Sequence, residues 1–430
     1  MLGINRLLKQ LADEGNYIKV GLVGAGQMGR GMISQIEKMK GMRVVITADI
    51  NVDNARKAYQ LAGLSEEKIK QSSDEIEATS FIKQDGVVIT NQIDLVTSIE
   101  AVDVVVDATG IPDVGATIAY QAIQNRKHIV MLNVETDVTV GPILKSMADA
   151  AGVVYTGSAG DEPGAIMELY DFADAMGFNI VTVGKGKNNK LNLEANPASA
   201  EEEAKQKGSS SKMLASFQDG TKTMVEMTAV ANAIGFLPDV AGMHGPSASV
   251  EELPTLLIPK EAGGILSNEK VVEYVNGVAP GVFVIFTSDQ EEVHHELQYL
   301  KLGEGPYYVL YRPYHLASLE TPLSIAKAYF DQQPTIAPWC GVVAETVTVA
   351  KKDLAEGEAL DGIGGFTVYG KILSKDDAIS KQALPLGLVD RHVVMKRPVK
   401  KGEIITYDVI EHKQETTIWN LRSLQDRLIK

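Results

Sequence analysis

The chain has 430 residues, of which 45% are hydrophobic and 23% charged, a balance typical of a globular enzyme of two or three domains. The 41 basic and 56 acidic side chains give a net charge of −15, which argues against nucleic acid or an anionic membrane as the main partner. No apolar run approaches the roughly 20 residues of a membrane span, and the N-terminus lacks the apolar core of a signal peptide. Cys340 is the single cysteine, which excludes an intrachain disulfide, so we expect a cytoplasmic protein.

The first motif is a glycine-rich turn between two apolar runs. Ile18–Val23 predicts a strand, the segment after the turn predicts a helix, and Met42–Ala48 predicts a second strand. This order is that of a dinucleotide-binding unit, in which glycines let backbone N–H groups approach a pyrophosphate at a helix N-terminus. We expect the turn to bind the cofactor through Gly24, Gly26, Gln27, Met28 and Gly29.

Asp49 follows the second predicted strand, 20 residues after Gly29. At this position a carboxylate accepts hydrogen bonds from the adenine ribose and repels a 2′-phosphate, which favours NAD over NADP. The alternative interpretation is an acid at the end of a strand that faces solvent.

Strands continue to alternate with helices as far as about Ser158, which predicts a parallel sheet with right-handed crossovers. The apolar runs that begin at Val102 and Lys127 predict strands buried on both faces. Ligands of such sheets bind beyond the carboxyl ends of the strands. We therefore expect the nicotinamide side of the site to be lined by Ala108, Thr109, Gly110 and Asn133.

Beyond Ser158 the pattern changes to that of an α+β domain with mostly antiparallel strands. A predicted strand over residues 179–183 runs into a turn that contains Lys185, Lys187, Asn188 and Asn189. Lysines bind anionic groups and donate protons once their pKa is lowered, and the asparagines add directional hydrogen bonds. We expect this turn to hold the anionic group of a substrate, with a solvated basic turn as the alternative.

Several carboxylates lie in predicted loops near the cleft and are candidates for acid–base chemistry or for Mg²⁺ or Mn²⁺ binding. The spacing of Glu135 and Asp137 predicts that both lie on one face of a strand. Helix capping and a buried structural ion pair are the alternative roles for the acids further along the chain. The candidates for a metal ion are Glu135, Asp161, Glu162 and Glu226.

Three further polar residues lie in predicted loops, and a structural imidazole is the alternative for each histidine. They are His244, Arg312 and His315. After a proline-containing segment, the similarity of residues 344–358 to residues 393–406 predicts a compact β-module without a catalytic constellation.

The chain resembles the homoserine dehydrogenase superfamily, and more closely the 1-deoxy-D-xylulose 5-phosphate reductoisomerase-like family, homoserine dehydrogenase-like proteins with a C-terminal SAF domain. The resemblance covers nearly the whole chain, and residues 343–407 are similar to SAF domains. The segments that carry it are Ala108–Pro112, Asn133–Pro142, Gly160–Pro163, Gly184–Asn189, Lys222–Met227, Ala241–Pro246 and Arg312–His315.

This resemblance implies an α/β protein with a Rossmann-type NAD(P)-binding domain over residues 1–160 and a return helix over 315–331. An α+β catalytic domain over 161–314 and a small β-rich SAF-like domain over 342–430 follow from it. It also implies the NADPH-dependent conversion of 1-deoxy-D-xylulose 5-phosphate to 2-C-methyl-D-erythritol 4-phosphate, an isoprenoid precursor reaction that uses a divalent cation. Asp49 departs from this pattern, because an NADPH enzyme prefers a basic or hydroxyl residue there.

We therefore expect an NAD(P)-dependent oxidoreductase that acts on a phosphorylated or otherwise anionic small molecule and forms a homodimer. An alternative is an NAD-dependent dehydrogenase of a sugar acid or hydroxy-amino acid. A second alternative is a non-catalytic cofactor sensor whose C-terminal module binds a partner.

Overall fold

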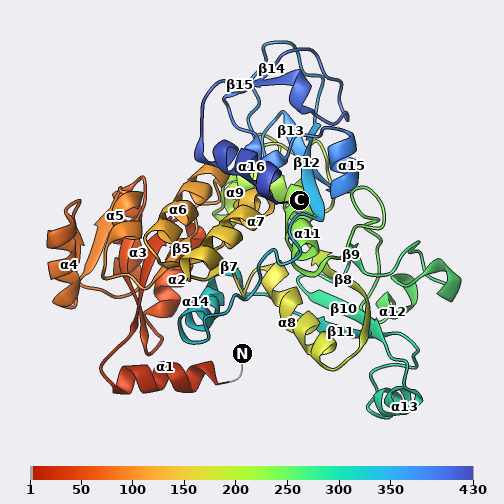
Figure 1. Ribbon diagram of the computed structural model, residues 1–430, viewed down its shortest axis with the longest axis horizontal. Helices are drawn as coiled ribbons and strands as arrows, with labels where there is room; N and C mark the ends of the chain where they lie inside the picture. The colour runs from red at the N-terminus through yellow and green to blue at the C-terminus, as the bar shows by residue number, and fades with distance from the viewer. Residues whose placement is uncertain (1–2, 430) are drawn as a thin grey trace. The chain divides into compact units, whose positions relative to one another are not determined.

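The computed structural model describes residues 3–429 (Figure 1). Two compact units divide these residues. The first ends at Asp161 and is joined by Leu316–Ala337 and Thr416–Ile429, whereas the second contains Glu162–His315 and Pro338–Glu415. The end of the predicted 342–430 domain thus lies in the first unit. A division into three domains with the predicted limits stays a prediction.

The first unit is built on a parallel sheet that has seven strands within the described residues, in the order β3-β4-β2-β1-β5-β6-β7. This sheet confirms the predicted Rossmann-type fold. Its strands are β1 (Ile18–Val23), β2 (Met42–Ala48), β3 (Ile69–Gln71), β4 (Val87–Thr90), β5 (Val104–Asp107), β6 (His128–Met131) and β7 (Tyr155–Gly157).

Helices alternate with these strands, as the apolar periodicity predicts. They are α1 (Ile4–Asp13), α2 (Gln27–Ile36), α3 (Val52–Leu61), α4 (Glu75–Lys83), α5 (Ile93–Ser98), α6 (Pro112–Gln124), α7 (Val134–Ala151), α14 (Thr321–Phe330) and α16 (Thr417–Leu428). In the part of the chain that the structure describes, no helix combines the length and apolarity that crossing a membrane requires.

Residues 133–137 start helix α7, so the expected placement of Glu135 and Asp137 on one face of a strand is wrong. Asn133 is the N-cap, and its side-chain oxygen accepts a hydrogen bond from the Thr136 backbone N–H at 3.2 Å. Both acids lie in the first helical turn, where negative charge is favoured by the helix dipole. An asparagine followed by two acids is the capping pattern that indicates this helix start.

The second unit is built on a mixed sheet in the order β11-β10-β8-β9. Strand β10 is antiparallel to β8 and β11, whereas β8 and β9 are parallel, so the expected antiparallel character holds for all but one pair. Helices α8 and α11 pack on one face of the sheet. The elements are β8 (Asn179–Lys187), β9 (Val271–Asn276), β10 (Val282–Thr287), β11 (Tyr308–Arg312), α8 (Glu162–Ala175), α9 (Glu201–Lys207), α10 (Ser211–Gln218), α11 (Thr221–Ile234), α12 (Leu253–Leu256) and α13 (Glu291–Tyr299).

The C-terminal β-module, residues 338–415, belongs to the second unit. Its two antiparallel pairs are β12 (Ala344–Ala350) with β13 (Val368–Ser374) and β14 (Val393–Met395) with β15 (Ile410–His412), and α15 (Lys375–Ser380) follows β13. The two similar segments of this module lie side by side. The N–H of Leu354 donates to the Val399 carbonyl at 2.8 Å, and the reverse bond is 3.1 Å long.

Candidate functional site

The glycine turn of the first unit has the backbone geometry of a phosphate-binding loop. Gly24 follows β1 with φ +99°, a conformation that side chains disfavour. A Cβ atom at Gly29 would lie 2.0 Å from the Gly24 carbonyl oxygen, so only glycine fits there. Gly26 is the N-cap of α2, and open space surrounds the position of its Cβ. Gln27 and Met28 form the first turn of α2, so these residues meet at one helix N-terminus.

Asp49 ties the end of β2 to the glycine turn. Its Oδ2 atom accepts the Ala25 backbone N–H at 2.7 Å. Its Oδ1 atom accepts the Asn51 backbone N–H at 2.9 Å and the Asn54 side-chain amide at 3.3 Å. Each carboxylate oxygen has two lone pairs, so one on Oδ2 is left for a ribose hydroxyl. The carboxylate is half-buried beside the loop, as the ribose role requires.

The expected nicotinamide-side residues lie where β5 and β6, neighbours in the sheet, end. The Asn133 amide donates to the Ile111 carbonyl at 3.0 Å, which joins the two strand ends. Asp107, the last residue of β5, accepts the backbone N–H and the hydroxyl of Thr109 at 2.8 and 2.7 Å. Burial raises the pKa of Asp107 to about 6, against the effect of these hydrogen bonds. Ala108 and Gly110 flank Thr109 in this loop. Asp107 was not among the predicted site residues, although, like Asp49, it stands at the end of a buried apolar run.

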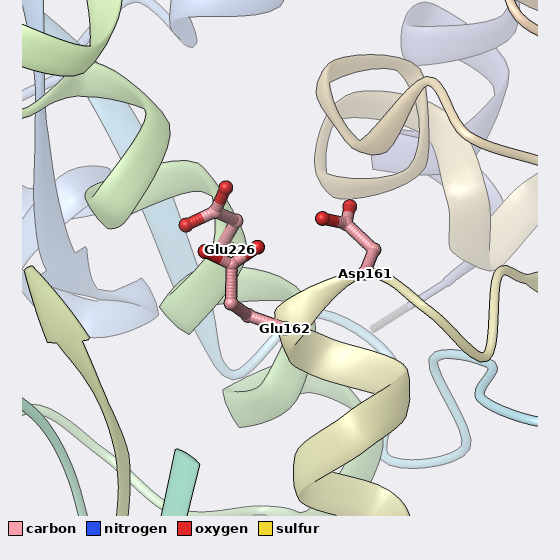
Figure 2. A group of neighbouring side chains, drawn as sticks. All are labelled: Asp161, Glu162 and Glu226. Carbon is pink, nitrogen blue, oxygen red and sulfur yellow. The ribbon is translucent and has the colours of Figure 1, made fainter. Parts of the chain in front are cut away.

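The second unit contains a buried cluster of three charged side chains. The Lys185 Nζ atom on β8 lies 2.6 Å from the Glu162 Oε1 atom, and it also donates to Glu226 on α11. Glu162 stands in the first turn of α8. The side chains of Lys185, Glu162 and Glu226 are 6, 11 and 1% exposed. Figure 2 shows the two glutamates projecting from their separate helices toward one region.

The charges in this cluster depend on one another. Burial alone would lower the pKa of the Lys185 ammonium, but the two carboxylates outweigh burial and raise it above its ordinary value. Burial and the repulsion of Glu162 raise the pKa of Glu226, which Lys185 partly counters. With all three groups ionised, two negative charges face one positive charge. This local excess of negative charge favours a further proton or a cationic group.

Glu162 and Glu226 are also expected ligands of a metal ion, together with Asp161. Oxygen atoms of Asp161, Glu162 and Glu226 all lie within 4.8 Å of one another (Figure 2). Mg²⁺ and Mn²⁺ need oxygen ligands that are free to approach the ion. The Lys185 ammonium already contacts two of the three groups, so the arrangement does not fit a divalent cation unless the lysine moves. Glu135 is not a member of this group and lies on α7.

Lys187 lies two residues further along β8, on the same face as Lys185 because strand side chains alternate. Its Nζ atom donates to the Phe217 carbonyl at 2.7 Å, and the residue is 6% exposed. Burial and the nearby Lys185 charge lower the pKa of Lys187 to about 8, although Glu226 and Asp219 oppose this effect. The amine is thereby mostly charged at neutral pH, with a minor neutral fraction that grows as the pH rises toward about 8.

Asn188 and Asn189 follow the end of β8, the first exposed and the second half-buried. The strand therefore extends through both lysines, and the expected basic turn begins only after them. A substrate-binding role for the two asparagines stays a prediction.

Two further candidates lie close to the cluster. The His315 Nε2 atom lies 3.4 Å from the Glu162 Oε1 atom. Arg312 on β11 is in register with Val282, which is itself in register with Lys185, so all three share one row across the sheet. The Arg312 guanidinium is 3.2 Å from Glu168 and stacks on the Tyr314 ring at 4.5 Å.

His244 has other partners. Its backbone N–H donates to Glu273 at 2.9 Å, and its Nε2 atom lies 2.8 Å from Asp239. Glu273 pairs with Gly184, the neighbour of Lys185 on β8, and successive strand residues point to opposite faces. The structure therefore gives His244 a hydrogen-bonded place beside Glu273 and does not join it to the Lys185 cluster.

One family of known proteins matches part of the chain. The family described as "Oxidoreductase DRL, catalytic domain" matches residues 160–321, which is less than half of the chain. The matched segment contains Glu162, Lys185, Lys187, Glu226 and His315. No curated protein matches the sequence.

Solved structures of dehydrogenases are among those to which the chain shows a distant likeness. The scyllo-inositol dehydrogenase of Lactobacillus casei, solved with NAD(H) and scyllo-inositol, is 12% identical, with a TM-score of 0.41 over 76% of this chain and 93% of that one. A protein of Thermotoga maritima described as a probable dehydrogenase is 11% identical, with a TM-score of 0.42 over 75% of this chain and 91% of that one. Values this low carry no inference about a substrate.

The oxidoreductase match, the parallel sheet and the glycine turn together define the class: the protein is an NAD(P)-dependent oxidoreductase. The match does not extend to the specific reductoisomerase or homoserine dehydrogenase assignment, or to a SAF domain. This class does not agree with the alternative of a non-catalytic cofactor sensor.

Proposed function

We propose that the protein is an NAD-preferring dehydrogenase of a small, anionic hydroxyl compound of the sugar-acid or hydroxy-amino-acid class. The observation that carries this proposal is the pairing of two buried lysines on one face of β8. Lys185 is held charged between two carboxylates, whereas Lys187 titrates near neutral pH. A fixed cation beside a proton-exchanging amine is a combination that can support alcohol oxidation.

The glycine turn and Asp49 would hold a nicotinamide dinucleotide, which would supply the acceptor for the hydride that leaves the substrate carbon. The neutral amine of Lys187 takes the proton of the substrate hydroxyl, and the charged Lys185 stabilises the negative charge that develops on the oxygen. Glu162 and Glu226 keep Lys185 in place. In the reverse direction Lys187 returns the proton to the carbonyl oxygen. Arg312, in the same row of the sheet, supplies a positive charge for the substrate carboxylate or phosphate.

Asp49 supports the preference for NAD. Its carboxylate is fixed beside the glycine turn by the Ala25 and Asn51 backbone N–H groups. A 2′-phosphate on the ribose would bring further negative charge to short range of this carboxylate. The preference would run opposite to the NADPH use that the family resemblance implies.

The reductoisomerase reaction is the second candidate, favoured by the grouping of three carboxylates. That reaction needs a divalent cation to bind neighbouring substrate oxygens. Lys185 takes the place that such a cation would need, which is why we favour simple dehydrogenation. Cytoplasmic location and a homodimer stay predictions.

The test is a screen of sugar acids, polyols, hydroxy-amino acids and 1-deoxy-D-xylulose 5-phosphate, with each coenzyme, monitored by NAD(P)H absorbance. For the substrate found, Lys187→Met is expected to lower kcat by about 10²-fold or more, the range for removal of an acid–base group. NAD affinity, measured by calorimetry, should stay within about twofold. The exposed Lys207→Met serves as the matched control with unchanged kcat. A Lys187→Met enzyme as fast as the wild type would overturn the proposal.

A further inference from the structure

A buried lysine of the C-terminal β-module bonds to a segment that also contacts the candidate site. Lys351 comes directly after β12 and is 5% exposed. Its Nζ atom lies 2.7 Å from Asp219 and donates to the carbonyls of Ala195 and Gly365 at 2.6 and 2.8 Å. An ammonium has three N–H donors, so these three acceptors satisfy it.

Asp219 lies in the short junction between α10 and α11. Its side chain accepts the Thr221 backbone N–H at 2.8 Å, which anchors the start of α11. Two residues earlier, the Phe217 carbonyl accepts the hydrogen bond of Lys187 at 2.7 Å. Helix α11 carries Glu226, the partner of Lys185. This junction thus connects Lys351 to Lys187 through Phe217, and to Lys185 through helix α11.

Two other bonds tie the β-module to the same helix. The Gly370 backbone N–H on β13 donates to the Thr221 hydroxyl at 2.9 Å. The hydroxyls of Thr346 on β12 and Thr228 on α11 are 2.8 Å apart in the buried interior. Because these contacts come from two different strands, the module supports α11 along its length rather than at one point.

We propose that Lys351 is a positioning residue of the proposed dehydrogenase, which through Asp219 holds the Phe217 carbonyl against Lys187 and partly offsets the Asp219 charge that acts on Lys187. The C-terminal β-module thereby contributes one positioning residue, Lys351, to the candidate site. This inference rests on the proposed function for its role in turnover. The geometric relation between Lys351 and Lys187 can be tested without turnover.

The electrostatic consequence has a definite sign. The charged groups that act on Lys187 are Lys185 on its own strand, Glu226 on α11, and Asp219, which Lys351 neutralises. Removing Lys351 leaves the Asp219 carboxylate without its buried counter-ion. Burial raises the pKa of Asp219, and loss of Lys351 raises it further, so the effect on Lys187 is exerted at pH values at which Asp219 is ionised. In this ionised form Asp219 favours the charged amine more strongly, and the pKa of Lys187 rises above about 8.

The experiment compares full-length wild type with Lys351→Met. Competitive acetylation of amines, quantified by mass spectrometry across a pH series, reports the pKa of Lys187 directly and needs no substrate. We expect the Lys187 labelling curve to move to higher pH in the variant. The rise of kcat/KM with pH should move to higher pH together with the labelling curve. At pH values below this rise, kcat/KM should fall about tenfold for each pH unit by which the curve moves. Lys352→Met, on the adjacent half-exposed lysine, is the matched control and should leave both curves in place.

The double variant Lys351→Met/Asp219→Asn removes both charges and should return the labelling curve toward that of the wild type, even if the single variant folds poorly. An unchanged Lys187 curve in folded Lys351→Met, or a double variant shifted as far as the single one, would overturn the inference. These outcomes are separate from failure of the proposed function, which appears as unimpaired turnover in Lys187→Met.

Discussion

The Nζ atom of Lys185 lies 2.6 Å from the Oε1 atom of Glu162, and the same ammonium also donates to Glu226. Strand β8, the first turn of α8 and the interior of α11 therefore converge on one buried positive charge. The lysine occupies the position between carboxylates that a divalent cation would otherwise take. The chemistry that we assign to the site, and its stability, both depend on this ammonium.

Lys185→Met should destabilise the protein strongly. The substitution leaves Glu162 and Glu226 as buried carboxylates without their shared counter-ion, and breaking a buried ion pair in this way typically costs about 3–5 kcal/mol. Urea unfolding of the variant at neutral pH is the measurement.

A second substitution serves as the control for this effect. Lys185→Met/Glu226→Gln removes one of the stranded charges, so it should recover part of the lost stability while turnover stays absent. If Lys185→Met alone unfolded at the same urea concentration as the wild type, the ion-pair cluster would not be a feature of the folded protein.

The pH dependence of the reaction should follow Lys187. Burial and Lys185 lower the pKa of this amine to about 8, so it is mostly charged below that pH and mostly neutral above it. Oxidation needs the neutral amine, and kcat/KM should therefore rise with pH and level off above about 8. Reduction needs the charged amine and should fall over the same range.

Initial rates in both directions give these profiles, and Lys187→Arg gives the comparison. Arginine stays charged throughout, so the alkaline rise in oxidation should vanish. A limb that persists near pH 8 in this variant would assign the ionisation to another group.

Asp49→Asn should shift the coenzyme preference. The substitution removes the negative charge but keeps an oxygen that can accept the Ala25 backbone N–H. We expect the ratio of kcat/KM for NADP to that for NAD to rise about tenfold, equivalent to about 1.4 kcal/mol. Asp53→Asn, at an exposed acid of the next helix, should leave the ratio unchanged. A wild type that used only NADP would show that the ribose pocket is assigned incorrectly.

The Gln425 side chain forms hydrogen bonds with two backbone groups of helix α7 where the helix is interrupted. Pro142 interrupts this helix, and the Gln425 amide donates to the Thr139 carbonyl and accepts the Ile143 backbone N–H, both at 3.1 Å. In an uninterrupted helix these two backbone groups would bond to each other. The Gln425 side chain on α16 is 1% exposed, and its amide group takes the place of this missing backbone hydrogen bond in α7.

Gln425→Leu should therefore cost about 1–3 kcal/mol of folding stability, because the buried Ile143 N–H loses its partner and the Thr139 carbonyl is left with the Arg422 guanidinium at 3.4 Å. Chemical unfolding gives the value, and hydrogen exchange at Ile143 should be faster. Gln10→Leu, on the exposed side of α1, is the control and should change stability by less than about 0.5 kcal/mol. Equal stabilities of the two variants would count against the inserted-amide interpretation.

The dinucleotide half of the protein could be predicted because its signals are local. The glycines, the apolar runs and Asp49 lie within about one strand-helix-strand unit, and each constrains the backbone near itself. The start of α7 at Asn133 was missed because the apolar content of residues 127–134 favours a strand. The N-cap pattern at Asn133 is the stronger signal, because an asparagine at this position accepts a hydrogen bond from a backbone N–H group of the first helical turn.

The substrate half could be predicted only as a set of residue types. Lys185 and Lys187 were identified by their chemistry, but their pairing with Glu162 and Glu226 depends on the packing of two helices on a sheet. No local spacing encodes that packing. The contact of Lys351 with Asp219 joins residues still further apart in the chain, in a module in which the sequence shows no catalytic pattern.

The most direct test of the account is the rate of the wild-type enzyme with its best substrate, measured with NAD and with NADP, in EDTA and in Mg²⁺ or Mn²⁺. We predict faster turnover with NAD and the same rate in EDTA as in the metal ions, because Lys185 supplies the positive charge of the site. Turnover that requires a divalent cation and NADPH would contradict the account and would favour the reductoisomerase reaction.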